Sequence, residues 1–482
     1  MNSIKTGLFY NTLNSILRII FPLVTAPYVA RVLAPEDLGL YHFGATYAGY
    51  FSLVALLGIP YYGVREIAKV SGKKSDASKL LSELLSIVLL NTVILSSLYT
   101  LSIFLFEKFN SNYTIFLIVG ISLYCSPFNI DWFFRGLEDF KHLTIRSIII
   151  KLLGIVLLFI CVRTRDDLVL YVLLSAFTTV VSDIWNFIVL YKKGYRVSIR
   201  LNGLSKHMKP LLILFATTIA ASIYTMLDSL MLGFLSGYSQ VAFYSYAVQT
   251  YRLLLVIITS MSAVALPRVS SYIENGSSKE VNDLINKSLS LVIFLSFPLC
   301  IGIFICSPVF IPLFLGNAYI GTVIPLQILS VQLVFIGLND IFAVQCLIAW
   351  GFDKFALYSV LCGTITNFLL NICLIPYYGA IGASVASVIA EGFVLLASYL
   401  FVRRNIAISF KNGKEYFMTA LACLLFIPIY LLGRAYLSGL VLLIVFFVVS
   451  ASSYLLIQYY VRNQSLMIVY SIIHNKILGR NK

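Results

Sequence analysis

The strongest constraint on the fold of this chain is a series of apolar segments, each about as long as a membrane is thick. A bilayer core of about 30 Å is crossed by an α-helix of roughly 20 apolar residues. Fourteen such segments occur among the 482 residues, at about 9–32, 40–62, 81–106, 113–134, 143–162, 168–190, 210–234, 241–265, 288–315, 320–349, 355–376, 380–402, 416–434 and 439–461. Hydrophobic residues make up 60% of the chain and charged residues 11%, against about 45–50% and about 25% in soluble domains. The excess must face lipid, so the sequence predicts an all-α integral membrane protein and excludes cytosolic enzymes and secreted domains.

The positive charges are distributed unevenly among the connecting segments. If the N-terminus is cytoplasmic, 27 lysines and arginines fall in segments on the cytoplasmic side, among them Arg135, Lys141 and Arg146, and only five fall on the outer side. Cytoplasmic loops of membrane proteins carry such an excess. The pattern therefore predicts that both termini are cytoplasmic. It also accounts for the net charge of +15 without a nucleic-acid partner.

A weak internal duplication predicts the domain organisation. When residues 16–68 are shifted by 203 positions, four residues coincide with identical ones: Ile16 with Ile219, Ile20 with Ile223, Tyr41 with Tyr244, and Arg65 with Arg268. A shift of six spans preserves orientation, as expected for parallel repeats. We therefore predict an N-terminal lobe (1–209), a C-terminal lobe (210–410), and a last pair of spans with a cytoplasmic tail (411–482). No loop is long enough for an ATP-binding fold, and no GxxxxGK[ST] motif occurs, so transport would be passive or driven by an ion gradient.

Several cationic and polar residues lie inside the predicted spans. A charge in hydrocarbon is costly, so such residues usually face protein or water. Along the first span the polar residues recur at helical spacing and form a stripe centred on Arg18. We predict a hydrated cleft between the lobes whose basic groups bind phosphate, which suits the planar fork of arginine. The candidate cationic ligands are Arg18, Lys151, Arg252 and Arg31, and the candidate polar lining residues are Asn11, Asn14 and Gln249.

Each cationic candidate also has a structural interpretation. Arg18 and Lys151 are long enough to reach the cytoplasmic headgroups from within their spans. Arg252 and Asp228 on neighbouring helices are alternatively a closed ion pair. Arg31 stands beside an acidic pair and is alternatively an anchor at the membrane interface. The sequence leaves these alternatives open.

Three acidic residues within the spans are candidates for ion coupling. They are Asp228, Asp340 and Glu391, which could bind H⁺ or Na⁺, although a structural contact between helices is an equally good explanation for them. The eight cysteines lie in apolar stretches and form no CxxC pair, so we expect no metal and no cofactor. Three tryptophans lie near predicted span ends and are predicted to belong to the interfacial aromatic belt: Trp132, Trp185 and Trp350.

Four segments of the chain resemble a known family. They are TAPYVARVLAPEDLGLYHFGATYAGYFSLVALLGIPYYGVREIAK (Thr25–Lys69), DWFFRGLEDFKHLTIRSIIIK (Asp131–Lys151), SIYTMLDSLMLGFLSGYSQVAFYSYAVQTYRLLLVIITSMSAVALPRVS (Ser222–Ser270) and NFLLNICLIPYYGAIGASVAS (Asn367–Ser387). In this order they resemble the bacterial polysaccharide flippases, the Wzx-type transporters of O-antigen and capsule units. The last two spans are covered by hydropathy only.

The resemblance implies a fold and a function. The family belongs to the multidrug/oligosaccharidyl-lipid/polysaccharide exporter superfamily, built as two six-helix lobes in a V around a central cavity. The implied activity is not enzymatic: a monomer in the bacterial inner membrane moves an undecaprenyl-diphosphate-linked glycan to the periplasmic leaflet by alternating access. The polymerase and the chain-length regulator of the same pathway are candidate partners. One departure is Gln249, where many relatives carry a lysine. Either Arg252 replaces that cation or the glycan has a different charge.

Two other transport functions remain open at this point. A peptidoglycan-precursor (lipid II) flippase would share the cationic cavity and is not excluded by physical arguments. A multidrug or organic-cation antiporter would bind its substrate with carboxylates and aromatic rings, so the three basic groups count against it. A membrane glycosyltransferase or polymerase would need large extramembrane loops, and the predicted outer loops are short.

Overall fold

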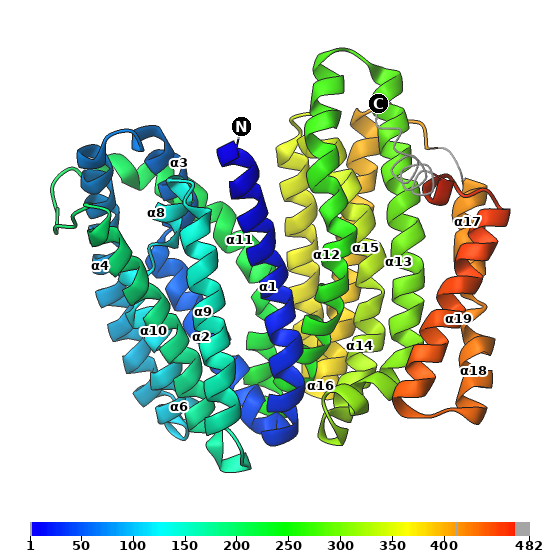
Figure 1. Ribbon diagram of the computed structural model, residues 1–482, viewed down its shortest axis with the longest axis horizontal. Helices are drawn as coiled ribbons and strands as arrows, with labels where there is room; N and C mark the ends of the chain where they lie inside the picture. The colour runs from blue at the N-terminus through cyan, green and yellow to red at the C-terminus, as the bar shows by residue number, and fades with distance from the viewer. Residues whose placement is uncertain (1, 411–412, 468–482) are drawn as a thin grey trace. The chain divides into compact units, whose positions relative to one another are not determined.

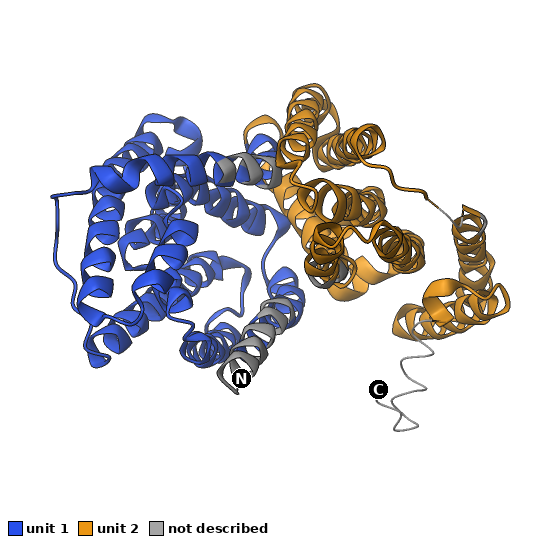
Figure 2. Ribbon diagram, turned by 90° about the horizontal axis from the view of Figure 1, so that it is seen from above, with its two compact units in different colours: residues 1–233 blue, residues 234–482 orange. Residues whose placement is uncertain are grey.

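The chain folds into two helical units. The computed structural model describes residues 2–410 and 413–467. The chain is 87% helical, and no strand occurs among the residues described. Contacts divide it into unit 1 (Met1–Gly233) and unit 2 (Phe234–Lys482), which Figure 2 shows in two colours. The lobe boundaries drawn from the sequence duplication stay a prediction.

Unit 1 contains the helices of the first half of the chain (Figure 1). They are α1 (Asn2–Val32), α2 (Pro35–Leu56), α3 (Ile59–Val70), α4 (Lys74–Leu105), α5 (Glu107–Asn110), α6 (Tyr113–Val119), α7 (Ile121–Tyr124), the 3₁₀ turn η1 (Ser126–Phe128), α8 (Asp131–Gly136), α9 (Phe140–Cys161), the 3₁₀ turn η2 (Arg165–Asp167), α10 (Leu168–Lys192) and α11 (Ser205–Leu235), whose last two residues belong to unit 2.

Unit 2 contains the remaining helices. They are α12 (Tyr238–Glu274), α13 (Ser278–Phe314), the 3₁₀ segment η3 (Asn317–Thr322), α14 (Val323–Ser330), α15 (Gln332–Asp340), the π-helix η4 (Ile341–Ile348), α16 (Asp353–Asn405), α17 (Gly413–Cys423), α18 (Phe426–Tyr436) and α19 (Gly439–Tyr460). The last three pack against α13 around Phe294, Tyr430 and Tyr454.

The helices have the length and the exposed surface of a membrane protein. Within residues 2–410 and 413–467, ten helices are long and apolar enough to cross a bilayer. Along α4, the side chains of Ile94, Leu98 and Leu101 are more than half exposed, as expected where the surroundings are lipid. The chain is therefore a multi-pass membrane protein, and the prediction of an all-α membrane fold is confirmed. The exact number of fourteen spans is not fixed by these ten helices.

The fourth predicted span, 113–134, is not one helix. The structure divides it into α6, α7, η1 and α8. The ring of Tyr99 on α4 packs so closely on Gly120 that a side chain there would overlap it, and the Tyr99 hydroxyl donates to the Phe116 carbonyl over 2.7 Å. Pro127 then lies inside η1. A proline has no backbone N–H to donate and is a common cause of a broken helix. The prediction of a continuous span was therefore wrong here.

Helix α16 contains the eleventh and twelfth predicted spans, joined by a reversal at one glycine. Gly379 has φ 53° and ψ −128°, a conformation that residues with a Cβ avoid. A side chain at Gly363 would overlap Val394, which shows that the two halves of α16 run back along each other. On α12, the Gln240 side-chain oxygen accepts a hydrogen bond from the Ala380 N–H over 3.0 Å and holds the turn. The two predicted spans are thus a helical hairpin.

An extended segment between α10 and α11 is fixed to α4 by three serines, which we call the serine ladder. Each serine hydroxyl oxygen accepts a backbone N–H of the segment: Ser78 from Arg196 (3.2 Å), Ser82 from Ser198 (3.1 Å) and Ser86 from Arg200 (2.9 Å). Four helical residues rise about 6 Å, and two extended residues rise about 6.6 Å. The spacing of the serines along α4 therefore matches the spacing of the backbone N–H groups along the extended segment over three hydrogen bonds.

Trp132 is not an interfacial residue. Its side chain is 3% exposed, and α8 packs it against α3 so closely that a Cβ at Gly63 would overlap the indole ring. The prediction from its position near a span end was wrong because the chain folds back on itself at this point. Trp132 instead belongs to an apolar core with Ile67 and Phe133.

Candidate functional site

The packing of α9 against α1 brings one predicted ligand to the helix that carries another. The Lys151 ammonium lies 4.9 Å from the centroid of the Phe21 ring, within the range of a cation–π contact. The Thr144 hydroxyl donates to the Tyr10 carbonyl over 3.0 Å and ties the same two helices together. Phe21 follows Arg18 by three residues, so Lys151 lies on the part of α1 that carries Arg18. The side chains of Arg18 and Asn11 lie outside the described residues.

The other two candidates on α1 differ in position. Asn14 is half-buried, one turn from Arg18. Arg31 is exposed at the far end of the helix, about 20 Å along its axis from Arg18 at 1.5 Å per residue. The structure therefore does not bring Arg31 to the segment with Lys151. A position at the end of a span fits the interfacial interpretation of Arg31.

The candidates of the second half lie on α12. Gln249 is half-buried and Arg252 is exposed, and the spacing of three residues puts them on one side of the helix. Both belong to unit 2, whereas Lys151 and Arg18 belong to unit 1. A joint site formed by residues from the two units stays a prediction.

The three candidate acids lie on three different helices. Asp228 on α11 is 5% exposed, and its charge acts on the Tyr50 hydroxyl of α2. Glu391 on the second half of α16 is 6% exposed. Asp340 is half-buried at the end of α15, where it lies next to the Ser262 hydroxyl of α12. Their role in ion coupling is not decided by these positions.

Asp340 adjoins an unusual backbone segment. The π-helix η4 begins directly after it, and the side-chain N–H of Gln345 within η4 donates to Ser262 over 2.7 Å. π-Helical segments are rare and occur often at functional sites. This bond joins α12 to η4 beside the Asp340 carboxyl group. Asp340 therefore stays a candidate for ion coupling.

A buried ion pair that the sequence analysis did not find lies between α8 and α9. Arg146 is 5% exposed, and its Nη1 and Nη2 donate to the two oxygens of Asp131 over 2.6 and 3.2 Å. The Asn186 amide on α10 donates to the same carboxylate over 2.7 Å, and its oxygen lies 3.0 Å from Nε2 of His142. Arg146, which the sequence analysis counted as a loop charge, is thus paired within the helical bundle. We call Asp131, Arg146, Asn186 and His142 the α8–α10 network.

A second buried network fixes the beginning of α11. His207 is 4% exposed and lies between two oxygens, Oε2 of Glu83 on α4 at 3.0 Å and the Tyr62 hydroxyl on α3 at 2.8 Å. Lys206 pairs with the same Glu83 oxygen at 2.8 Å. The chain thus enters α11 held by a carboxylate, directly after the serine ladder.

The sequence carried one signal for the α8–α10 network. Asp183 and Asn186 are polar residues one turn apart inside the apolar sixth span, and such residues usually face a partner. The partners of Asn186 in this network, His142 and Asp131, precede it by 44 and 55 positions. Only the packing of α10 against α9 shows that these residues meet.

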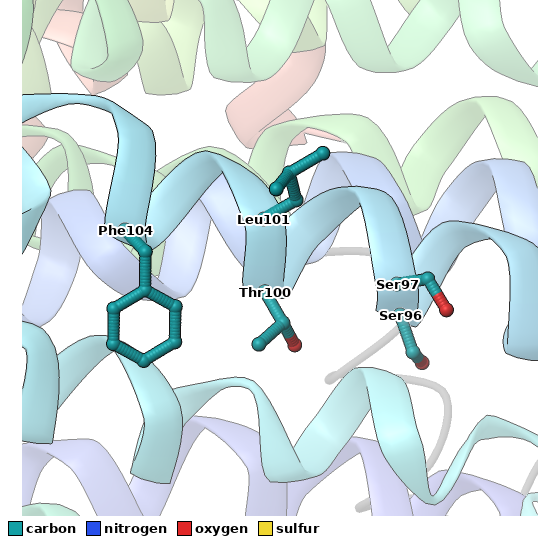
Figure 3. Close-up of a pocket in the computed structure, with 5 residues that line it drawn as sticks. All are labelled: Ser96, Ser97, Thr100, Leu101 and Phe104. Atoms are coloured by element: carbon teal, nitrogen blue, oxygen red, sulfur yellow. The ribbon is translucent and has the colours of Figure 1, made fainter.

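A groove on α4 is lined by uncharged residues (Figure 3). Ser96, Ser97 and Thr100 contribute hydroxyl groups, and Leu101 and Phe104 contribute apolar surface. The groove contains none of the predicted ligands. It has no group that would bind a phosphate by charge.

The chain matches known proteins along most of its length. Residues 4–273 match the family of polysaccharide biosynthesis proteins, and residues 214–373 match the MatE family. The chain belongs to the polysaccharide biosynthesis protein family. The family predicted from the four segments is thereby confirmed. This polysaccharide biosynthesis protein is also 24% identical over 388 residues to a putative O-antigen transporter of Escherichia coli K12, which covers 80% of the chain and 93% of that relative.

Other relatives and solved structures agree with this placement. The lipid II flippase MurJ of Bacillus subtilis is 26% identical over 155 residues, 32% of the chain and 28% of that relative. A structure of MurJ in an inward closed conformation has a TM-score of 0.74 at 18% identity and covers 95% of this chain and 99% of that one. An inward-facing MATE transporter of the MOP superfamily has a TM-score of 0.62 at 17% identity and covers 83% and 98%. This polysaccharide biosynthesis protein therefore has the fold of these transporters.

Proposed function

We propose that this protein is a flippase. It moves undecaprenyl-diphosphate-linked oligosaccharide repeat units from the cytoplasmic to the periplasmic leaflet by alternating access, and it catalyses no chemical reaction. The observation that carries the proposal is the similarity to putative O-antigen transporters, which extends over 93% of the length of the Escherichia coli relative. The excess of lysine and arginine in alternate loops supports an inner-membrane protein with both termini in the cytoplasm.

The geometry of unit 1 supports a site for the diphosphate. The Lys151 ammonium on α9 lies over the Phe21 ring of α1, one turn from Arg18. A lysine is a common phosphate ligand, and an arginine binds two phosphate oxygens at once. In our proposal Arg252 supplies a further positive charge from α12, with Asn11, Asn14 and Gln249 lining the cavity. Arg31 lies too far along α1 to join them.

The first test replaces the proposed ligands one at a time. We expect Arg18→Ala and Arg252→Ala to abolish the surface glycan, because the diphosphate loses its bound counter-charge, while the amount of protein in the membrane stays normal. Surface glycan is measured by immunoblotting and protein by an epitope tag. Arg404→Ala is the matched control, since Arg404 is an exposed arginine at the end of α16. Normal glycan display by both ligand variants would refute their role.

Ion coupling is a separate part of the proposal. The burial of Asp228 and Glu391 and the position of Asp340 beside a π-helix support binding of H⁺ or Na⁺. Vesicles that contain the protein and the glycan lipid are tested with and without an imposed proton or sodium gradient. Equal rates of flipping under all conditions would remove ion coupling from the mechanism.

A lipid II flippase is the second candidate function. The sequence similarity to MurJ of Bacillus subtilis favours it, and both functions need a site for a lipid diphosphate. Expression of the protein in cells depleted of their own lipid II flippase separates the two. We expect no rescue of growth, whereas rescue would favour the second candidate.

A further inference from the structure

A buried carboxyl group that the proposed glycan site does not use lies beside the α8–α10 network. Asp183 lies on α10, one turn before Asn186, and is 6% exposed. Its charge interacts with the charges of Asp131 and Arg146. Two carboxyl groups therefore lie within electrostatic reach of one guanidinium group, and Asp183 lies on the turn of α10 next to Asn186, which bonds to Asp131. That guanidinium uses both Nη atoms for Asp131.

The charges of this cluster balance only if one carboxyl is protonated. With both carboxyls ionised, Asp131, Asp183 and Arg146 carry a net charge of −1 in a buried site, which is costly. Asp131 accepts hydrogen bonds from Arg146 and from Asn186, and these bonds favour its ionised form. A single proton on Asp183 makes the cluster neutral. The arrangement of one stabilised and one excess carboxyl is typical of groups that share a proton.

We propose that Asp131, Arg146 and Asp183 form a proton-binding site in unit 1, in which Asp183 takes up and releases the proton. The site is distinct from the three acids singled out in the sequence, because Asp340 and Glu391 belong to unit 2 and Asp228 lies on α11. As the site of the coupling ion, it rests on the proposed function. As a proton-binding site, it does not depend on the substrate.

A chain of polar groups leads from the site toward the basic end of α10. Because the Asn186 N–H donates to Asp131, its oxygen must accept, so Nε2 of His142 carries a hydrogen. His142 is half-buried, and beyond it Asp139 pairs with Lys193 at the end of α10. Asp183 precedes Lys192 by nine residues, about 14 Å along the helix. Asp183 therefore lies well inside α10, and the polar groups beside it extend toward the basic end of that helix.

Charged and titratable groups surround Asp183 on several elements. Asp131 on α8, Arg146 on α9 and Cys125 between α7 and η1 interact with Asp183 itself. Arg135 on α8 acts on Asp131, and His142 on α9 bonds to Asn186. Tyr41 on α2 contacts Ser175, about 12 Å along α10 from Asp183. Arg146 is the buried cation among them. The balance between Asp131, Asp183 and Arg146 thus decides whether the site holds a proton.

The proton is detected directly by infrared difference spectroscopy of the full-length protein in lipid vesicles, between about pH 5 and about pH 8. A buried protonated carboxyl gives a carbonyl band that disappears when the proton leaves. We expect this band in the wild type, its loss in Asp183→Asn, and a shifted band in Asp183→Glu, which keeps a carboxyl at the site. Asp166→Asn, a change of an exposed aspartate in the same unit, leaves the band unchanged.

Two outcomes would overturn the proposal. One is a titrating band that Asp183→Asn and Asp183→Glu both leave in place. The other is the absence of a titrating carboxyl band in the wild type, which would make the cluster a structural network only. The Glu variant keeps the test valid if the Asn variant does not fold, because it preserves the carboxyl group.

Coupling to transport is measured in vesicles with the glycan lipid and an imposed proton gradient. We expect the gradient to accelerate flipping by the wild type and by Asp166→Asn but not by Asp183→Asn. Acceleration of Asp183→Asn equal to that of the wild type would refute the coupling role. If the carboxyl band titrates as expected but no glycan lipid is flipped, the proton site stands and the proposed function fails.

Discussion

The two units stabilise their buried polar groups in different ways. In unit 1, the α8–α10 network joins a carboxylate, a guanidinium and an amide. In unit 2, a neutral network joins the Tyr244 hydroxyl to Ser387 at 3.0 Å and the Asn371 amide to Asn367 at 3.0 Å. Hydrogen bonds that involve charges are stronger, but breaking a buried charged pair is also more costly. The charged network of unit 1 can respond to pH, whereas these two bonds of unit 2 join uncharged groups.

Two tyrosines that the predicted duplication aligns make similar contacts in the two units. Tyr41 on α2 bonds to Ser175 on α10 at 2.9 Å, and its counterpart Tyr244 on α12 bonds to Ser387 on the second half of α16. In each unit a tyrosine of the second predicted span of its lobe contacts a serine of the sixth span of the same lobe. The predicted shift of 203 positions relates the two tyrosines but not the two serines, because it takes Ser175 to Tyr378. The charged network lies between α8, α9 and α10 of unit 1.

The largest effect is expected from removing the cation of the charged network. Arg146→Met leaves the half-buried Asp131 carboxylate without its cation and lowers the free energy of unfolding by about 3 kcal/mol, the lower end of the range for buried pairs, because Asp131 is partly exposed. The measurement is denaturant unfolding of the purified protein. Asp131→Leu combined with Arg146→Met should recover more than half of the loss, because no charge then remains unpaired. A double variant as unstable as the single one would contradict the assigned cause.

A smaller effect is expected from the neutral network of unit 2. Asn371→Ala removes the donor to the Asn367 oxygen in a fully buried position and costs about 1–3 kcal/mol. The cost should be the same at about pH 5 and about pH 8, because neither partner titrates in this range. Unfolding curves at both pH values test this. A pH-dependent cost would end the distinction between the two networks.

The smallest effect is expected from the serine ladder. The ladder is uncharged but lies in unit 1, so it tests whether the size of an effect depends on charge or on the unit. Ser82→Ala removes the acceptor of the Ser198 N–H and costs about 0.5–1.5 kcal/mol. Faster hydrogen exchange at the Ser198 amide reports the loss directly. Ser97→Ala is the control on the same helix, since Ser97 is exposed and its hydroxyl donates only within α4, to Val93. Equal exchange in both variants would count against the ladder.

Individual residues show how far the sequence could predict the site. Lys151 was predicted as a phosphate ligand from its place inside an apolar span, and the structure places its ammonium over the Phe21 ring of α1, a contact that the sequence did not predict. Arg146 was placed among loop charges because Lys141 and the end of a span are near it in sequence. Its buried position depends on Asp131 and Asn186, which no local pattern links to it.

The sequence by itself determined that the chain is an α-helical membrane protein of the polysaccharide biosynthesis family, because helix length and apolar composition are fixed by the bilayer and need no knowledge of packing. Only the tertiary structure decided which polar groups meet. It broke the fourth predicted span at Tyr99 and Gly120, buried Trp132 and paired Asp131 with Arg146. The physical reason is that apolar periodicity says which residues avoid water, whereas the partner of a buried charge is set by contacts between helices that are distant in the sequence.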